Sequence, residues 1–523
     1  MSRRRYLYAC VFIAGFSALG AELAASRLLD PWFGNSLIVW ASLIGLILAY
    51  LSVGYLLGGW LADRWPRPSL LYHLLGLAGA GLGLVPMISR PVLRLASGGF
   101  SEWSFNVALL AGSLLAVLIL FAGPMILIGC VAPFAIRLAL SDLSFGGRTA
   151  GRIYSLSTVG SIAGTFLTPL VLIPWLGTRW TFAVLGGSLL LAAIVGLLFS
   201  GRSLDVAAYG VLGALLAFLL WWGGRGPIKP EAGLLYEAES PYNYIQVVRQ
   251  GTEVQLRLNE GQGLHSVYDP AGGLSYGIWD YFLLAPLFRA AEPEPEAVGR
   301  VCLIGLAGGT VARLYTEAFG PVPIDGVEID PAVIDVGRRY FAMNEPNLTS
   351  IAQDGRIFLR HTAQRYDVIA VDAYRPPYIP FHLTTVEFFQ LARSRLTPNG
   401  VVAVNVGRTH DDFRLVDAIA SPAAQVFPSV YVIDEPDPGY GLGNSLVVAT
   451  ARATTLLDFQ RNSAEATNPL VRQVLDQAGK QVRAWAPVPG TPVFTDDRAP
   501  VEQVVHSIIL RYLFEEPDLS HDQ

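Results

Sequence analysis

The stretch VCLIGLAGGT, residues 301–310, decides the fold of the carboxyl-terminal half of this 523-residue chain. It begins as a short apolar run typical of a buried strand and ends in a glycine-rich turn. Three further strands follow, each with an acidic residue at its carboxyl end: Glu328, Asp354 and Asp372. Strands that alternate with helices predict a parallel, doubly wound α/β sheet, which binds its ligand at the carboxyl ends of its strands.

These strand ends suit an adenosine-containing cofactor. Gly305 and Gly309 would let the backbone approach the ligand beside a helix amino terminus, where N–H groups are free. Glu328 can accept hydrogen bonds from both ribose hydroxyls. Asp354, followed by Gly355, can accept one from an adenine amino group.

Asp372 ends the strand beside the switch point of the sheet, where reacting atoms sit. The full G-x-G-x-x-G fingerprint of NAD-binding folds is not satisfied. A Rossmann-like fold of the methyltransferase type is therefore favoured. Taken one at a time, the acidic residues could equally be ordinary loop residues of an α/β sheet. Their order along the chain is what favours a binding site.

The amino-terminal half has the composition of a membrane domain. The chain is 52% hydrophobic and only 15% charged, whereas soluble proteins average about a quarter charged residues. A helix that crosses a bilayer needs about twenty apolar residues. Seven segments meet this criterion, at residues 6–29, 38–62, 69–89, 104–128, 151–176, 178–199 and 204–222. An eighth span results if 104–140 forms two short helices rather than one kinked helix.

Two arguments about topology oppose each other. Arg3, Arg4 and Arg5 favour a cytoplasmic amino terminus, and Arg64 and Arg148 fit cytoplasmic loops if there are seven spans. Seven spans would then place the carboxyl-terminal domain outside. Adenosine-type cofactors are cytosolic, so we expect an integral protein of a bacterial-type inner or plasma membrane with a cytosolic catalytic domain.

Four regions follow from these patterns. Residues 1–222 are the transmembrane helical domain, 223–233 a Gly/Pro linker, 234–298 a small β-subdomain with alternating apolar residues, and 299–523 the nucleotide-binding domain. The net charge of −5 without a basic stripe predicts no nucleic-acid partner. The three cysteines do not lie at metal-ligand spacing, so no metal is expected. The expected partners are a small-molecule substrate and the lipid bilayer, with a homodimer left open.

Several motifs together resemble one known family. They are ESPYNYIQV (239–247), LRLNEGQGLHS (256–266), VCLIGLAGG (301–309), VEIDPAVIDVGRRYF (327–341), the QDGRIF strand end (353–358), YDVIAVDAYRPPYIPFHLTTVEFF (366–389) and TDDRAPVE (495–502). In combination they resemble the spermidine synthase (polyamine aminopropyltransferase) family in its membrane-fused form. The resemblance implies a donor of the S-adenosylmethionine type, usually decarboxylated, with methylthioadenosine as by-product.

The resemblance also implies roles for individual residues. Glu328 would hold the ribose, Asp354 the adenine, and Asp372 would lie near the reacting carbon. Further residues lie in the segments that wall the acceptor side: Tyr242, Asn243, Gln262 and His265. Of these, Gln262 is expected to contact the donor, and the other three the substrate.

Two departures from the family pattern concern charge. Gly308 stands where the glycine loop of the family carries an Asp, and the D-S-x-D signature becomes D-A-Y-R, with Arg375 in place of the second Asp. A fixed cation disfavours an ammonium acceptor and can bind a carboxylate through two hydrogen bonds. One hypothesis is therefore that intact S-adenosylmethionine is the donor and that its carboxylate meets Arg375. The alternative is that Arg375 turns outward or pairs with a nearby acid.

The expected reaction is a transfer at the aminopropyl side of the donor, of the aminopropyltransferase type. Asp372 would accept the proton that the amine loses, and Tyr374 would help to position the acceptor. Three alternatives remain. They are intramolecular cyclisation of intact S-adenosylmethionine, a membrane methyltransferase that releases S-adenosylhomocysteine, and a transporter or sensor whose soluble half only binds nucleotide.

Overall fold

The computed structural model describes residues 3–34, 37–98, 105–140, 146–223, 226–259, 263–290, 294–374, 379–436, 442–478 and 481–514. The chain divides into two compact units. One consists of Met1–Pro230 and Glu239–Tyr244, and the other of Glu231–Ala238 and Ile245–Gln523. Each unit is described by itself.

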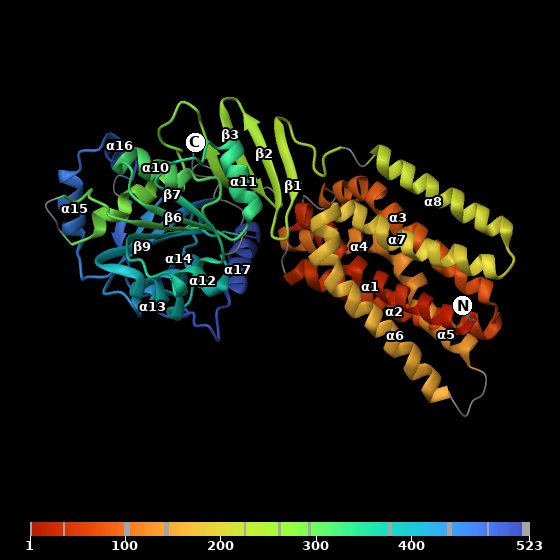
Figure 1. Cartoon of the computed structure of the whole chain (residues 1–523). Coiled ribbons are helices and arrows are strands. Elements are labelled where there is room, and N and C mark those ends of the chain that lie inside the picture. Colours follow the sequence, from red (N-terminus) through yellow and green to blue (C-terminus); the bar gives the residue numbers. More distant parts are fainter. Residues whose placement is uncertain are drawn as a thin grey trace, which may run out of the picture. The chain divides into compact units, whose positions relative to one another are not determined.

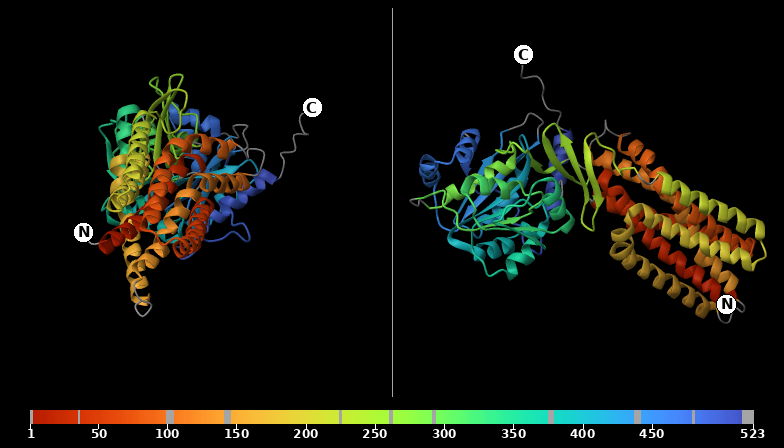
Figure 2. Two further views of the ribbon diagram at one scale, coloured as in Figure 1. Left: turned by 90° about the vertical axis from the view of Figure 1, so that its right-hand side faces the viewer. Right: turned by 45° about the horizontal axis from the view of Figure 1, so that its top comes forward.

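The first unit is helical. Its elements are α1 (Arg3–Phe33), α2 (Leu37–Arg64), α3 (Pro68–Gly98), α4 (Phe105–Gly129), α5 (Val131–Ala139), α6 (Gly146–Leu167), the π-helix η2 (Thr168–Leu172), α7 (Ile173–Phe199) and α8 (Ser203–Gly223). Helices α1, α3 and α7 pack alongside one another (Figures 1 and 2). Among the described residues, six helical stretches are long and apolar enough to cross a membrane.

The longest of these stretches, Gly146–Phe199, covers 54 residues. A straight helix of that length would extend about 80 Å, far beyond a hydrocarbon core of about 30 Å. The helix is interrupted at Gly177, whose φ of 76° and ψ of 167° are not helical. The parts before and after Gly177, residues 146–176 and 178–199, are each long enough to be a span.

The described part of the segment 104–140 holds two consecutive helices. Helices α4 and α5 follow each other with a break at Cys130, and together they give a single candidate span, Leu110–Ala139. Helix α5 has nine residues, which extend about 14 Å, whereas a hydrocarbon core is about 30 Å thick. Helix α5 is therefore too short to be a span by itself.

Small residues let α1 and α6 touch through their backbones. A Cβ atom at Gly15 would collide with the carbonyl oxygen of Ser157, and one at Gly160 would collide with that of Phe12. Helices that pack inside a bilayer commonly approach through such residues because close contact maximises dispersion attraction.

The second unit begins with a small sheet of order β1-β2-β3-β4. Its strands are β1 (Leu234–Glu239), β2 (Tyr244–Gln250), β3 (Glu253–Leu258) and β4 (Leu264–Tyr268). Strand β3 pairs antiparallel with both β2 and β4. The β1–β2 turn, Glu239–Tyr244, belongs to the helical unit.

The large sheet has eight strands in the order β12-β10-β11-β9-β8-β5-β6-β7. The strands are β5 (Val301–Ile304), β6 (Ile324–Glu328), β7 (Leu348–Ala352), β8 (Tyr366–Val371), β9 (Leu396–Thr409), β10 (Ser429–Asp434), β11 (Leu442–Thr450) and β12 (Val482–Ala484). Strands β9, β8, β5, β6 and β7 are parallel neighbours. The remaining pairs are antiparallel.

The expectation of a parallel sheet is therefore confirmed for β5 to β9, and the tail strands β10, β11 and β12 add antiparallel neighbours. After β9, helix α14 (Arg414–Ala424) leads to β10, and the chain then turns back directly into β11. A direct return can only be antiparallel, because parallel neighbours need a longer crossover. Strand β11 pairs with β9 along its whole length, so the tail extends the sheet beyond its parallel core.

Helices cover both faces of this sheet. One face packs on the short helix α9 (Ile278–Tyr281), the 3₁₀ helix η3 (Phe282–Phe288), α10 (Thr310–Phe319), α15 (Leu456–Glu465) and α16 (Pro469–Ala478). The other packs on α12 (Gly355–His361), α13 (Val386–Arg395), α14 and α17 (Val501–Phe514). Side chains of β9 alternate between the faces: Val401 and Ala403 join the first core, and Val402 and Val404 the second. Helix α11 (Pro331–Tyr340) packs with β2 and β3.

Candidate functional site

Strands β5 and β8 are neighbours, and the chain leaves them toward opposite edges of the sheet. This switch point brings Gly305 and Asp372 together. The Asp372 amide donates to the Ile304 carbonyl at 2.8 Å. Gly305 has a φ of +88°, and a Cβ there would collide with the Asp372 carbonyl. The glycine is therefore required by the neighbouring strand, independently of any ligand.

The glycine turn leads from β5 into α10 through two left-handed residues, Ala307 (φ 48°) and Gly309 (φ 88°). The Gly308 amide donates to Ser266 Oγ at 2.8 Å. A Cβ at Gly308 would lie 2.9 Å from the Ser266 Cβ and 3.1 Å from the Phe341 ring. The position that carries Asp in the family pattern is thus closely packed by strand β4 and by the residue after α11.

Glu328 at the end of β6 is held toward this turn. Its carboxylate accepts hydrogen bonds from the amides of Ala307 at 3.0 Å and Asp330 at 3.2 Å. Burial raises the Glu328 pKa to about 7, although these hydrogen bonds oppose the rise. Each oxygen keeps acceptor capacity, so a ribose hydroxyl can still bind here.

Asp354 has a structural task of its own. It caps helix α12 by accepting from the Ile357 amide at 2.9 Å, and its other oxygen lies 3.0 Å from His382 Nε2. The His382 hydrogen bond is the main reason why the Asp354 pKa is lowered. Gly355, the next residue, lies so close to Ile304 that a Cβ would overlap its side chain.

The TDDRAPVE segment is tied to the same helix. Arg356 donates to both oxygens of Asp496, at 2.7 and 2.6 Å, and Thr385 Oγ1 donates to Asp496 at 2.7 Å. Asp496 therefore fixes α12 and the start of α13 to the tail, a fold-supporting role close to Asp354.

The Asp372 carboxylate accepts hydrogen bonds from two neutral donors. Trp279 Nε1 in α9 donates to Oδ2 at 2.9 Å, and Asn405 Nδ2 in β9 donates to Oδ1 at 2.8 Å. Burial raises the Asp372 pKa to about 6, and the two hydrogen bonds limit the rise. The result is a carboxylate that is ionised at neutral pH and is still basic enough to accept a proton.

Tyr374 lies two residues after Asp372. Its phenol oxygen accepts a hydrogen bond from the Gly407 amide. Burial is the main cause of a raised Tyr374 pKa, to which the Asp372 charge adds. Tyr374 therefore stays a neutral phenol, which can donate its proton in a hydrogen bond. Arg375 and Gln262 lie outside the described residues.

The other predicted substrate residues occupy two places. His265 in β4 is partly buried, and burial lowers its pKa to about 4, so its imidazole is neutral at physiological pH. The amides of Tyr242 and Asn243 donate to Ser240 Oγ at 3.1 and 2.8 Å. Their turn belongs to the helical unit, in which Arg27 donates to the Pro241 carbonyl.

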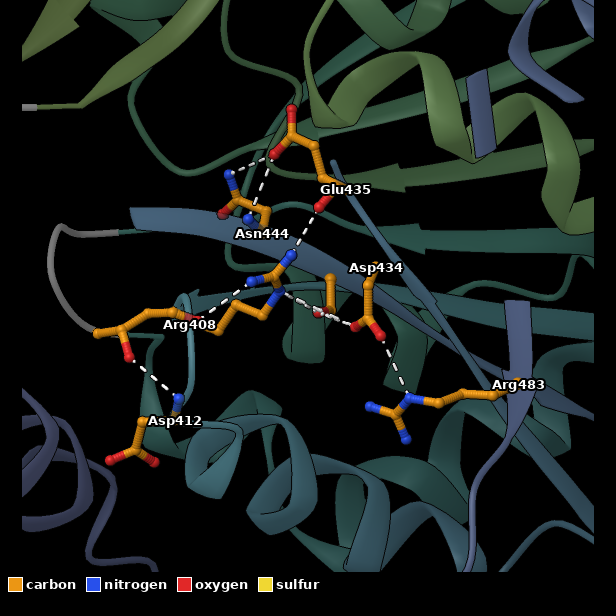
Figure 3. A network of polar contacts seen from close by, with 8 residues as sticks. Arg408, Asp412, Asp434, Glu435, Asn444 and Arg483 are labelled. Atoms are coloured by element: carbon orange, nitrogen blue, oxygen red, sulfur yellow. Dashed lines mark hydrogen bonds and ion pairs between the residues drawn. The ribbon is translucent and has the colours of Figure 1, made fainter. Parts of the chain in front are cut away.

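A polar network around the buried Arg408 joins the carboxyl ends of β9 and β10 to β11 and β12 (Figure 3). Arg408 of β9 donates to Ser445 Oγ at 3.1 Å and to the Glu435 carbonyl at 2.6 Å. Asp434 accepts from Ser445 at 2.6 Å and from Arg483 at 3.2 Å. Successive side chains of a strand point to opposite faces of the sheet. Arg408 lies three positions after Asn405 in β9, so the two side chains point to opposite faces. Arg408 braces the strand that carries Asn405 without pointing to Asp372.

Sequence reasoning missed Trp279, Asn405 and Arg408. An amide and a guanidinium within the apolar run VVAVNVGR were the available signals, because polar groups in a buried strand need partners. Among the described residues, no group of three or more His, Cys, Asp or Glu side chains could hold a metal ion.

These features define a class: a methyltransferase-like α/β domain with a glycine turn after β5 and acidic residues at the carboxyl ends of β6, β7 and β8. The spermine/spermidine synthase domain family matches residues 302–456. The chain therefore carries a spermine/spermidine synthase domain, which confirms the resemblance drawn from the sequence.

Several known proteins have sequences similar to this chain. The probable polyamine aminopropyl transferase of Bifidobacterium longum is 30% identical over 53% of this chain and 64% of that protein, less than two thirds of the relative. The polyamine aminopropyltransferase of Mycobacterium tuberculosis is 26% identical over 91% of each chain. Putrescine N-methyltransferase 2 of Nicotiana tabacum is 29% identical over 40% of this chain and 58% of that protein.

Proposed function

We propose that the protein is a membrane-bound transferase that attacks the aminopropyl side of S-adenosylmethionine or of its decarboxylated form and releases methylthioadenosine. The observation that carries the proposal is the Asp372 carboxylate at the switch point, with its pKa of about 6 and its two neutral donors. The family of the domain supports the same chemistry.

The reaction needs little from the protein beyond orientation and a proton acceptor. The sulfonium of the donor is an activated leaving group. The amine nitrogen forms a bond to the carbon attached to sulfur, the C–S bond breaks, and its electron pair stays on sulfur. Asp372 accepts the proton that the nitrogen loses, and Tyr374 donates its phenol hydrogen to orient the acceptor.

The donor would lie along the strand ends in the order expected from the sequence. We propose that Glu328 holds the ribose and that Gly305 and Gly309 allow the turn to approach. Asp354 would accept from the adenine, using acceptor capacity that the helix cap and His382 leave free.

We propose intact S-adenosylmethionine as the preferred donor. A side chain at Gly308 would have to displace Ser266 and Phe341, which disfavours the carboxylate that the family pattern places there to hold an ammonium group. Arg375 supplies a cation instead, which suits the carboxylate of the intact donor. A polyamine acceptor is correspondingly disfavoured, and cyclisation of the intact donor by its own amine becomes a competing route.

A by-product assay tests the proposal. Purified full-length protein is incubated with each donor, with and without an added amine, and the adenosine product is identified by mass spectrometry. Methylthioadenosine is expected, and its release without added amine would identify cyclisation. Failure to form it from either donor under any of these conditions would contradict the proposal.

A methyltransferase is the second candidate, favoured by the similarity to putrescine N-methyltransferase 2. Methyl transfer attacks the other carbon on sulfur and leaves S-adenosylhomocysteine. The same mass spectrum separates the two reactions, because the by-products differ in the group retained on sulfur.

We propose that the helical unit spans a membrane, supported by the length and apolar composition of its helices. The catalytic domain is placed in the cytosol, where the donor is made. If seven helices cross the membrane, the amino terminus with Arg3–Arg5 then lies outside. This placement opposes the usual excess of arginine on the cytoplasmic side. A fluorescent protein fused to the carboxyl end should therefore fluoresce, and alkaline phosphatase fused there should be inactive. An active phosphatase would place the domain outside.

A further inference from the structure

A cavity opens between the amino-terminal parts of helices α1 and α6. It has a volume of about 520 Å³, and its lining consists of Tyr8, Arg148, Gly151, Arg152, Ser155 and Leu156. Ligand sites commonly have volumes of about 300–1,000 Å³. The cavity belongs to the helical unit, whereas Asp372 belongs to the other unit. It is therefore a candidate binding site of its own.

The cavity lies at the level of the lipid headgroups if α1 and α6 cross a bilayer. A Cβ at Gly160 would meet the Phe12 carbonyl and one at Gly164 that of Phe16, so the two helices run parallel and begin at the same end. Helix α1 has 31 residues, about 45 Å, whereas a hydrocarbon core is about 30 Å thick. Its first turns, and those of α6 beside them, therefore reach the polar headgroup region.

The lining of the cavity is positively charged. Arg148 and Arg152 lie one turn apart on α6, and both are exposed. Like charges at this spacing repel each other, and an anion between them relieves the repulsion. Arg4 donates to the Tyr8 hydroxyl at 3.2 Å, which adds a third cation at the rim. A phosphodiester suits this arrangement, because guanidinium groups bind phosphate oxygens through paired hydrogen bonds.

Two acidic side chains described at this end of the helical unit pair with other arginines. Asp63, at the end of α2, lies 3.1 Å from Arg137 Nε near the end of α5. Asp205, at the start of α8, pairs with Arg202. Neither acid lines the cavity. These two carboxylates therefore do not neutralise it.

The outer face of α6 continues from the cavity in a way that favours a lipid over free phosphate. In steps of three and four residues, which keep to one face of a helix, it carries Arg148, Arg152, Ser155, Val159, Ile162 and Phe166. The last three form an apolar strip and are 49%, 52% and 61% exposed. A cationic part followed by an exposed apolar strip matches a phosphate headgroup followed by acyl chains.

We propose that this cavity binds the phosphodiester headgroup of an anionic membrane phospholipid. The inference rests on the proposed membrane crossing of the helical unit and not on the transfer reaction. Arg148 and Arg152 hold the phosphate oxygens, and the Ser155 hydroxyl donates to another headgroup oxygen. An acyl chain lies along the apolar strip. Basic pockets between membrane helices bind anionic headgroups by the same means.

The test measures lipid binding to the full-length protein in dodecyl maltoside by the rise in melting temperature. Dioleoyl phosphatidylglycerol is compared with dioleoyl phosphatidylcholine, which has the same acyl chains and no net charge. The wild type should reach half of its maximal rise at an about 10-fold lower concentration of phosphatidylglycerol. The double variant Arg148→Gln, Arg152→Gln should lose most of this preference. Because both side chains are exposed, it should fold and melt like the wild type in phosphatidylcholine.

The double variant Arg64→Gln, Arg67→Gln is the matched control. It removes two positive charges from the same end of the helical unit, and these residues are exposed but do not line the cavity. It should keep the preference of the wild type. Inorganic phosphate and glycerol 3-phosphate test the source of the phosphate, because they carry the anion without acyl chains. Neither should stabilise the wild type as far as phosphatidylglycerol does.

The inference is overturned if the wild type binds both lipids equally or if Arg148→Gln, Arg152→Gln keeps the full preference. An equal loss in the control would also overturn it, since the attraction would then be to the basic end as a whole. Full stabilisation by a soluble phosphate would mean a site for free phosphate instead. An alkaline carbonate wash of membranes tests the crossing itself. Release of the protein would refute membrane insertion, whereas a retained protein without lipid preference would refute only the lipid site.

Discussion

The indole Nε1 of Trp279 donates a 2.9 Å hydrogen bond to Oδ2 of Asp372, across 93 residues of sequence. The donor comes from the short helix α9, ahead of the nucleotide fold, and the acceptor ends β8. An indole N–H is a neutral donor and cannot take up a proton. It therefore stabilises the carboxylate without competing for the proton that Asp372 is expected to accept.

Trp279→Phe should move the acid limb of the pH–rate profile upward. Activity depends on the ionised form of Asp372, so it should rise with pH through a pKa of about 6 in the wild type. Loss of the indole donor removes a contact that lowers this pKa, and the limb should shift to higher pH by about 1 unit. The profile of kcat/KM measures the shift. An unmoved or lowered limb would show that the hydrogen bond does not tune Asp372.

Glu328→Gln should become more stable than the wild type as pH rises. Burial raises the Glu328 pKa from 4.5 to about 7, so folding favours its protonated form. That contribution is present below pH 4.5 and is lost as pH rises through 7. The melting temperature of the variant minus that of the wild type should therefore increase from pH 5 to pH 8. A constant difference would argue against the raised pKa.

The same substitution tests the ribose role. A neutral amide has one oxygen, whereas the carboxylate has two that can receive both ribose hydroxyls. Calorimetry at pH 8 should show methylthioadenosine binding about 10-fold weaker or worse in Glu328→Gln. Equal affinity in the two proteins would remove Glu328 from the cofactor site.

Gly308→Asp, which restores the acid of the family pattern, should destabilise the domain. Its Cβ would lie 2.9 Å from Ser266 and 3.1 Å from the Phe341 ring. Overpacking of this kind typically costs about 1–3 kcal/mol. Adding Ser266→Gly should recover part of the loss in melting temperature. A single variant as stable as the wild type would mean that the turn has room for a carboxylate.

The parallel half of the sheet was predictable because its signals are local. The runs at 301–304 and 367–371 are apolar and bounded by turn residues, and they form β5 and β8 with almost the expected limits. Strand β9 extends over Leu396–Thr409, well beyond the apolar run at 401–404. Its length is set by pairing with β11 on one side and β8 on the other, which a single sequence does not reveal.

The partners of Asp372 depend on strand order rather than on local pattern. Trp279 lies in YGIWDYFLLAP, which reads as ordinary core, and its ring is indeed buried. Only the meeting of α9 with the end of β8 gives its N–H a function. Asn405 was visible as an amide within an apolar strand, but the carboxylate that it contacts belongs to the neighbouring strand.

The central claim is that Asp372 is the proton acceptor for transfer from the aminopropyl side of the donor. The most direct measurement is methylthioadenosine release by wild type and Asp372→Asn, with donor binding measured by calorimetry in parallel. The account predicts release by the wild type, a loss of about 100-fold or more in the variant, and similar donor binding in both. Unchanged release in Asp372→Asn, or S-adenosylhomocysteine as the product of the wild type, would contradict it.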